Sequence, residues 1–232
     1  MKVIVFDLGG TLMEYVGMPN SWVDYYTQGF EAINEKYNLN ASELDIMKSV
    51  SALKKFNPRV NYREKEYSPE YIFSRVLEHW KNHISIEKCI NTFFEGLNLK
   101  AMIYSDTIPV LEELKNMGYT VATLTDLPTG MPDELFKKDI PNLLKYFNLY
   151  VSSQSCGFRK PNSKGLQQIA EYYRVPITEL IFIGDEEKDR KTAVNAGCHF
   201  ILINRNEKVR DGICSLHELE ALLEKRKEQN FP

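Results

Sequence analysis

The stretch "VIVFDLGGTLMEY", residues 3–15, combines an apolar run with a carboxylate at its end. Four β-branched or aromatic residues stop abruptly at Asp7, and two glycines and a threonine follow. An apolar run of this length, bounded by turn residues, is typical of a strand that is covered on both faces. Ligands of open α/β sheets bind beyond the carboxyl ends of the strands. Asp7 therefore lies where a binding or catalytic site is expected.

Strand and helix patterns alternate along the chain from about residue 100 onward. Further strands are predicted at 119–125, 149–153, 179–185 and 199–204. Helical patterns lie at 107–118, 162–175 and 187–197, with Asp106 or Thr107 as a possible N-cap and Gly118 and Gly197 as stops. This alternation predicts an α/β fold with a doubly wound, Rossmann-like parallel-sheet core.

Residues 16–104 have a different pattern. Four helical segments are predicted there, at 21–38, 41–56, 68–83 and 85–98, and no strand candidate of weight lies among them. We therefore expect an all-helical cap domain at 16–104. It would be inserted into a core domain made of residues 1–15 and 105–232.

Composition argues against several classes of function. The 232 residues carry a formal net charge of -3 without an extended basic stripe, so no nucleic-acid partner is expected. No apolar run reaches the roughly 18 residues of a membrane span, and the N-terminal run is too short for a signal peptide. The four cysteines lack metal-binding spacing, which is typical of reduced thiols in a cytoplasmic protein.

Polar side chains also follow other predicted strands. Thr125 and Asp126 end the strand at 119–125, and Asp185 ends the strand at 179–185, with Asp189 four residues later. Converging carboxylates repel one another unless a cation lies between them. Oxygen ligands suit a hard divalent ion, and magnesium is the leading candidate.

These motifs, in this order, resemble those of the haloacid dehalogenase-like hydrolases. That family carries an aspartate nucleophile in D-x-D-x-T, a Thr or Ser at the end of the next core strand, a downstream Lys and a late G-D-x-x-x-D. The corresponding segments are "DLGGT" with Asp7 and Thr11, "TLTD" with Thr125, "GFRKP" with Lys160, and "GDEEKD" with Asp185 and Asp189. The resemblance covers the core and the ordering of the whole chain, and it implies that the helical insert is a mobile cap.

The resemblance implies a role for each position. Asp7 would attack phosphorus and form an aspartyl-phosphate, supported by a catalytic set completed by Thr11, Thr125 and Lys160. The phosphate would be bound by Leu8, Gly9, Gly10, Thr125, Asp126 and Lys160. Mg²⁺ would be held by Asp7, Asp185 and the Gly9 carbonyl, while Asp189 would orient its water shell. The implied function is hydrolysis of a small phosphorylated metabolite by a monomer or homodimer.

Gly9 departs from the family pattern. The family's phosphatases usually have an aspartate there, which protonates the leaving group and then activates water. Glycine can do neither, and positioned acid–base catalysis is typically worth about 10²–10⁴ in rate. We therefore expect a slow or specialised phosphatase. A good leaving group would not need the acid, and Glu14, Asp126 or a cap residue could replace it.

Two other functions stay open. A phosphonatase-like C–P hydrolase would need a Schiff-base lysine in the cap, and the candidates are Lys36, Lys48, Lys54 and Lys55. A catalytically impaired binding or regulatory protein would keep the pocket without turnover. The polar loop at 57–67 contains Arg59, Arg63 and Lys65, which suit anionic substrate groups, although a solvated loop has the same pattern. The sequence does not identify the substrate.

Overall fold

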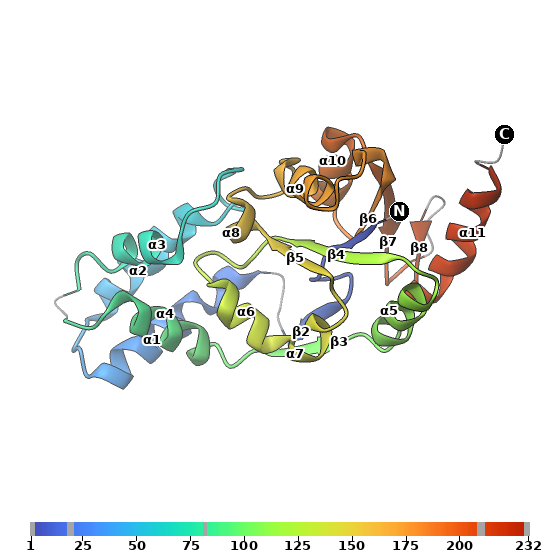
Figure 1. The fold of residues 1–232 in the computed structure, drawn as a ribbon. Coiled ribbons are helices and arrows are strands. Elements are labelled where there is room, and N and C mark those ends of the chain that lie inside the picture. Colours follow the sequence, from blue (N-terminus) through green and yellow to red (C-terminus); the bar gives the residue numbers. More distant parts are fainter. Residues whose placement is uncertain (1–2, 18–20, 81–82, 208–211, 230–232) are drawn as a thin grey trace.

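A computed structural model, which describes residues 3–17, 21–80, 83–207 and 212–229, is built on one parallel sheet (Figure 1). The strand order is β5-β4-β1-β6-β7-β8, and every pairing is parallel. The strands are β1 (Val3–Phe6), β4 (Thr120–Thr125), β5 (Leu149–Ser152), β6 (Leu180–Gly184), β7 (His199–Ile203) and β8 (Gly212–Ile213). β1 lies between β4 and β6, so the strand order reverses there. The prediction of a doubly wound core is confirmed.

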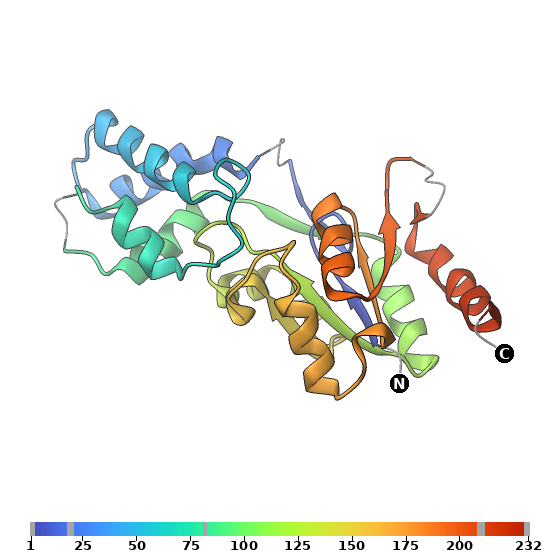
Figure 2. The same ribbon diagram turned by 90° about the horizontal axis from the view of Figure 1, so that it is seen from above.

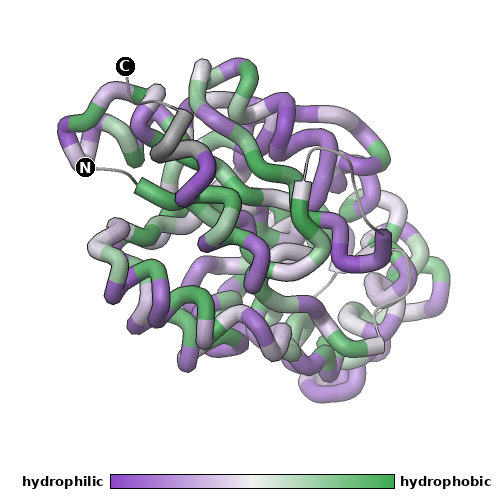
Figure 3. Tube along the Cα trace, turned by 90° about the vertical axis from the view of Figure 1, so that its right-hand side faces the viewer, coloured by the Kyte–Doolittle hydropathy of each residue, from purple (hydrophilic) through white to green (hydrophobic). Residues whose placement is uncertain are grey.

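Helices cover both faces of this sheet (Figure 1). One face packs against α9 (Lys164–Tyr173) and α10 (Glu187–Ala196), and the other against α5 (Thr107–Asn116) and α11 (Leu219–Gln229). Along β1, Val3 and Val5 join the first core, whereas Ile4 and Phe6 join the second. Burial on both faces explains why the strand sequences are continuously apolar. Figure 3 shows hydrophobic residues gathered in these central strands.

A second group of helices lies at one end of the molecule, away from the C-terminus (Figure 2). It contains the 3₁₀ helix η1 (Trp22–Tyr25), α1 (Tyr26–Tyr37), α2 (Glu43–Phe56), α3 (Pro69–Val76) and α4 (Ile86–Gly96). These helices share a separate apolar cluster, in which the ring centroids of Phe30 and Phe93 are 4.9 Å apart. We refer to residues 21–98 as the helical unit. α3 ends at Val76, seven residues earlier than the predicted segment 68–83.

A two-stranded antiparallel ribbon connects the helical unit to the core. It consists of β2 (Met13–Val16) and β3 (Lys100–Ile103), and Val16 pairs with Lys100. The ribbon does not belong to the main sheet. Neither strand was predicted from the sequence, because each has only four residues and is partly exposed.

The remaining short elements were also not predicted. They are α6 (Asp133–Asp139), α7 (Pro141–Leu144), α8 (Ser153–Cys156), the 3₁₀ helices η2 (Ile177–Glu179) and η3 (Leu216–Glu218), and the edge strand β8. Within the described residues, no helix is both long enough and apolar enough to cross a membrane.

Candidate active site

The predicted site residues meet at the carboxyl ends of β1, β4 and β6. Most of them line a cleft of about 490 Å³, whereas Leu8, Thr11 and Asp189 are not among its lining residues. The core contributes Asp7, Gly9, Thr125, Asp126, Lys160 and Asp185, and the helical unit contributes Trp22, Asn57, Arg59, Tyr62 and Arg63. The adjacent positions of the three strands in the sheet bring these segments together although they are far apart in sequence.

Lys160 lies between two buried carboxylates. Its Nζ is 2.8 Å from Asp7 Oδ1 and 2.6 Å from Asp189 Oδ1. Burial lowers the pKa of Lys160, but the charges of Asp189 and Asp7 raise it more, so the ammonium keeps its proton. Asp189 Oδ2 accepts a hydrogen bond from the Glu186 N–H (2.9 Å) at the start of α10. Both Asp189 oxygens therefore have partners, which favours a supporting role over direct metal ligation.

The carboxylates at the ends of β1 and β6 have raised pKa values. Burial raises the pKa of Asp7 to about 6, with Lys160 opposing and Asp189 adding to the rise. Burial, followed by repulsion from Asp7 and Asp189, raises the pKa of Asp185 to about 7. Carboxylate oxygens of Asp7, Asp185 and Asp189 lie within 4.8 Å of one another. A divalent cation would relieve this repulsion, so the residues present fit a Mg²⁺ site.

The turn after Asp7 offers backbone groups to a ligand. The N–H groups of Leu8 and Gly9 have no acceptor, and the Gly9 carbonyl no donor, among the described residues. Gly10 was expected to bind phosphate, but its N–H donates to Met13 O (2.8 Å) and is not available. Gly10 has φ +75°, and a Cβ there would lie 2.1 Å from Asp185 Oδ2. Its contribution is therefore to let Asp185 approach the turn.

The Thr11 side chain contacts Asp185 and does not line the cleft. Its Oγ1 donates to Asp185 Oδ1 (3.4 Å), and it is not among the residues that line the cleft. Its carbonyl accepts a hydrogen bond from Arg205 Nη2 (2.5 Å). Arg205 also forms two 3.1 Å hydrogen bonds with the Asp106 carboxylate. Asp106 was expected only as a possible N-cap, but its side chain makes no cap hydrogen bond. Arg205 was not predicted as a site residue.

Thr125 and Asp126 form the wall next to Lys160. Thr125 ends β4 and is buried at the cleft. Asp126 Oδ1 accepts a hydrogen bond from the backbone N–H of Lys160 (3.0 Å). Burial acts to raise the pKa of Asp126, but the nearby charges, Arg159 foremost, hold it below its ordinary value. Asp126 is therefore ionised and poorly suited to donate a proton to a leaving group.

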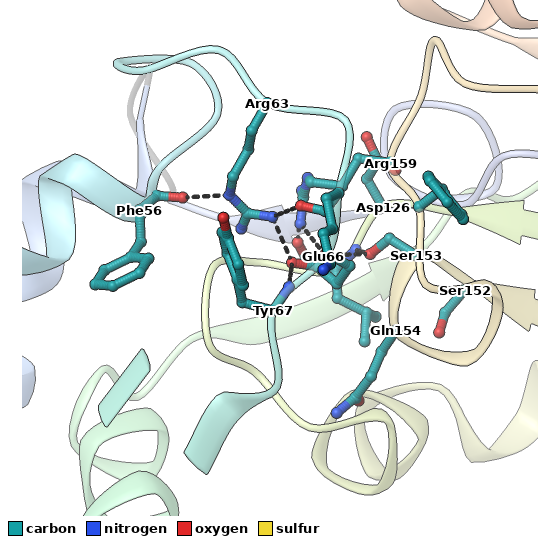
Figure 4. A network of polar contacts seen from close by, with 12 residues as sticks. Phe56, Arg63, Glu66, Tyr67, Asp126, Ser152, Ser153, Gln154 and Arg159 are labelled. Carbon is teal, nitrogen blue, oxygen red and sulfur yellow. Dashed lines mark hydrogen bonds and ion pairs between the residues drawn. The ribbon is translucent and has the colours of Figure 1, made fainter. Parts of the chain in front are cut away.

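The loop at 57–67 lies over the cleft. Of the three basic residues in this loop, for which a solvated loop was the alternative, Arg59 and Arg63 line the cleft and Lys65 does not. Arg59 Nη2 is 2.6 Å from Glu186 Oε1. Glu66, which was not predicted from the sequence, has a carboxylate that contacts both the loop and the core (Figure 4). Nothing in the local pattern "REKEY" distinguishes it from a solvated acid.

Comparisons with known proteins agree with these motifs. The profile of a hydrolase family, haloacid dehalogenase-like hydrolase, matches residues 1–197. A phosphoglycolate phosphatase from Vibrio vulnificus is 27% identical over 207 residues, which are 85% of this chain and 81% of that protein.

Two solved structures share the fold. A 2-haloacid dehalogenase from Pseudomonas syringae superposes with a TM-score of 0.69 at 20% identity, covering 97% of this chain and 99% of that one. A HAD phosphatase from Thermococcus onnurineus superposes with a TM-score of 0.63 at 20% identity, covering 96% and 98%. At these identities the two structures support the fold alone.

Proposed function

Because this chain belongs to the haloacid dehalogenase-like hydrolase family, we propose that it is a magnesium-dependent phosphatase that acts through an aspartyl-phosphate on Asp7. One observation carries the proposal: Asp7 ends β1 in a cleft, 2.8 Å from Lys160, and is followed by the N–H groups of Leu8 and Gly9, which have no acceptor among the described residues. A nucleophile, a fixed cation and free amide donors thus converge on one point. Phosphoryl transfer depends mainly on such positioning and charge neutralisation.

In the first step a carboxylate oxygen of Asp7 forms a bond to phosphorus, and the leaving-group oxygen departs with the electron pair. Lys160 offsets charge on Asp7 and on the phosphoryl group, which the Leu8 and Gly9 amides and the Thr125 hydroxyl orient. Asp7, Asp185 and the Gly9 carbonyl would hold Mg²⁺, which neutralises charge on the phosphate oxygens when bound. In the second step a water oxygen forms a bond to phosphorus and the bond between phosphorus and the Asp7 oxygen breaks, so inorganic phosphate leaves, the Asp7 carboxylate is regenerated, and the proton of the water passes to a base or to solvent.

Gly9 supplies no proton to the leaving group and no base to the water. Glu14 lines the cleft, where its carboxylate accepts the Tyr104 hydroxyl (3.0 Å), and it is the available replacement. The low pKa of Asp126 argues against that residue. We therefore infer that the enzyme favours phosphoesters with good leaving groups or turns over slowly.

We further propose that residues 16–104 act as a cap that closes over the substrate. Arg59 and Arg63 at the cleft suit an anionic group on the non-phosphate end of a small substrate. The relative from Vibrio vulnificus is a phosphoglycolate phosphatase, so 2-phosphoglycolate is the first compound to test.

The structure gives no support to a phosphonatase-like reaction. The described residues that line the cleft include two lysines, Lys160 and Lys188, and both belong to the core. Of the candidate cap lysines, Lys36 pairs with Glu95 at 3.2 Å, and Lys48 pairs with Asp45 at 3.7 Å.

The test is phosphate release from a panel of phosphomonoesters, including an aryl phosphate and 2-phosphoglycolate, with and without Mg²⁺. We expect Mg²⁺-dependent release that Asp7→Asn abolishes. Full activity of a folded Asp7→Asn variant would exclude Asp7 as the nucleophile. Binding of inorganic phosphate without any turnover would instead identify the protein as a binding or regulatory module.

A further inference from the structure

The loop at 57–67 is paired with a core segment through its backbone. The Glu66 N–H donates to Gly157 O (2.9 Å), and the Arg159 N–H donates to Glu64 O (2.6 Å). Lys65 and Phe158 face one another as antiparallel partners. The segment that reaches Lys160 is thus joined directly to the helical unit.

A closed ring of hydrogen bonds extends this pairing. Glu66 Oε2 accepts hydrogen bonds from Ser153 Oγ (2.7 Å) and from Arg159 Nη1 (Figure 4). Arg159 Nη2 donates to Leu127 O (2.8 Å), and the Leu127 N–H donates to Ser153 Oγ (3.1 Å). We call these four residues the Glu66 ring. Glu66 is its sole member from the helical unit.

The Glu66 carboxylate is removed from water. Its side chain is 7% exposed, and that of Arg159 is 6% exposed. The second oxygen, Oε1, accepts hydrogen bonds from Arg63 Nη1 (2.9 Å) and the Tyr67 N–H (3.0 Å). A buried ion pair that loses one partner leaves an uncompensated charge, which is strongly unfavourable. Loss of Glu66 would therefore leave the buried Arg159 guanidinium without its ion-pair partner, which favours a shift of the side chain.

The Glu66 ring joins the two segments that build the phosphate site. Leu127 follows Thr125 and Asp126, and Arg159 precedes Lys160. The two segments also meet directly, where the Lys160 N–H donates to Asp126 Oδ1 (3.0 Å). The distance between Lys160 and the end of β4 therefore depends on a ring that a residue of the helical unit completes.

We propose that Glu66 is a positioning residue that holds Lys160 and the Thr125–Asp126 segment in their catalytic geometry only while the helical unit is closed over the cleft. The inference rests on the proposed function, because it assigns Lys160 to phosphoryl transfer. When the unit opens, Arg159 loses its carboxylate. The Asp126 carboxylate then attracts the freed Arg159 guanidinium. This interaction competes with the hydrogen bond that Asp126 accepts from the backbone N–H of Lys160. Closure over substrate would thus assemble the site.

The test compares Glu66→Gln, which keeps the shape but removes the charge, with Glu64→Gln as a matched control. Glu64 lies on the same loop and accepts a hydrogen bond from Asn162 of the core (2.9 Å), but it is not in the ring. With an aryl phosphate and Mg²⁺, we expect Glu66→Gln to lower kcat by about 10- to 100-fold with a smaller change in KM. Glu64→Gln should stay within about threefold of the wild type, as expected for a side chain outside the site.

Two further variants separate positioning from charge. Arg159→Lys keeps a cation but loses the fork that reaches Leu127 O, so it should be as slow as Glu66→Gln. The double variant Glu66→Gln/Arg159→Lys should be no slower than the slower of the two single variants, because both changes disrupt one ring. A wild-type kcat in Glu66→Gln, or losses that multiply in the double variant, would overturn the proposal.

Amide hydrogen exchange tests the ring without turnover. In the ligand-free protein, Glu66→Gln should speed exchange in 64–66 and 157–159 together, whereas Glu64→Gln should not. Equal exchange in wild type and Glu66→Gln would refute the ring's role in closure. A wild type that has no phosphatase activity but shows this exchange difference would count against the proposed function and leave the coupling between the two segments standing.

Discussion

Replacing Gly9 with aspartate is the most informative single change. The Cβ of residue 9 would have no heavy atom within 4 Å, and Gly9 does not have a positive φ. An aspartate can therefore be accommodated without strain, pointing into the cleft that Gly9 already lines. Repulsion from Asp7 and Asp185 would raise the pKa of the new carboxyl group, which favours a proton donor near neutral pH.

The magnitude follows from the missing chemistry. Positioned acid–base catalysis contributes about 10²–10⁴ in rate, and a newly introduced group is not held by supporting hydrogen bonds. We therefore expect at least a tenfold faster turnover, equivalent to about 1.4 kcal/mol of transition-state stabilisation. The gain should be larger for an alkyl phosphate than for an aryl phosphate, because the poorer leaving group has more need of the proton.

The assay is rapid-quench kinetics with Mg²⁺, with Gly9→Asn as a control of the same size that cannot transfer the proton. Wild type and Gly9→Asn should show a burst of phenol release from the aryl phosphate as the aspartyl-phosphate accumulates on Asp7. Gly9→Asp should lower the amplitude of the burst and raise the steady-state rate of turnover. If a folded, Mg²⁺-binding Gly9→Asp variant is no faster than Gly9→Asn on either ester, another residue already transfers the proton or the natural reaction is different.

Three further outcomes are expected. Asp185→Ala should abolish calorimetric Mg²⁺ binding, and unchanged affinity would move the metal elsewhere. Gly10→Ala should lower Tm and weaken Mg²⁺ binding, because the new Cβ would lie 2.1 Å from Asp185 Oδ2. A non-glycine residue in the left-handed region also costs roughly 1–2 kcal/mol. Gly9→Ala, in contrast, should change Tm little. Because the folded pKa values of Asp7 and Asp185, about 6 and 7, exceed the ordinary value, the metal-free fold gains stability as pH falls through this range. The rise in Tm on adding Mg²⁺ should therefore be larger near pH 8 than near pH 5.5, and equal rises would contradict the raised values.

The core could be predicted from the sequence because its signals are local. Val3–Phe6 is apolar at every position, and Asp7 follows directly, so strand and strand end are both visible without tertiary contacts. The order of the four motifs then gave Thr125, Lys160 and Asp185, which all line the cleft.

The rest depends on contacts between distant parts of the chain. The Arg205–Asp106 pair spans 99 positions and the Arg159–Glu66 pair spans 93, so no local pattern reveals either. The end of α3 was missed for another reason. Leu77 and Trp80 are buried after the helix has ended, and this continues the apolar period of the helix into a turn.

The β2–β3 ribbon has a consequence for how the molecule can be rebuilt. The chain leaves at Val16 and returns at Lys100, which are direct partners in an antiparallel pair, and the Cα atoms of such partners lie about 4.5–5.5 Å apart. A two-residue hairpin turn closes a gap of this size. The segment between them can therefore be grafted or exchanged as a cassette without interrupting the main sheet, and a cassette that again supplies a carboxylate to Arg159 would place a new substrate preference on the same reaction centre.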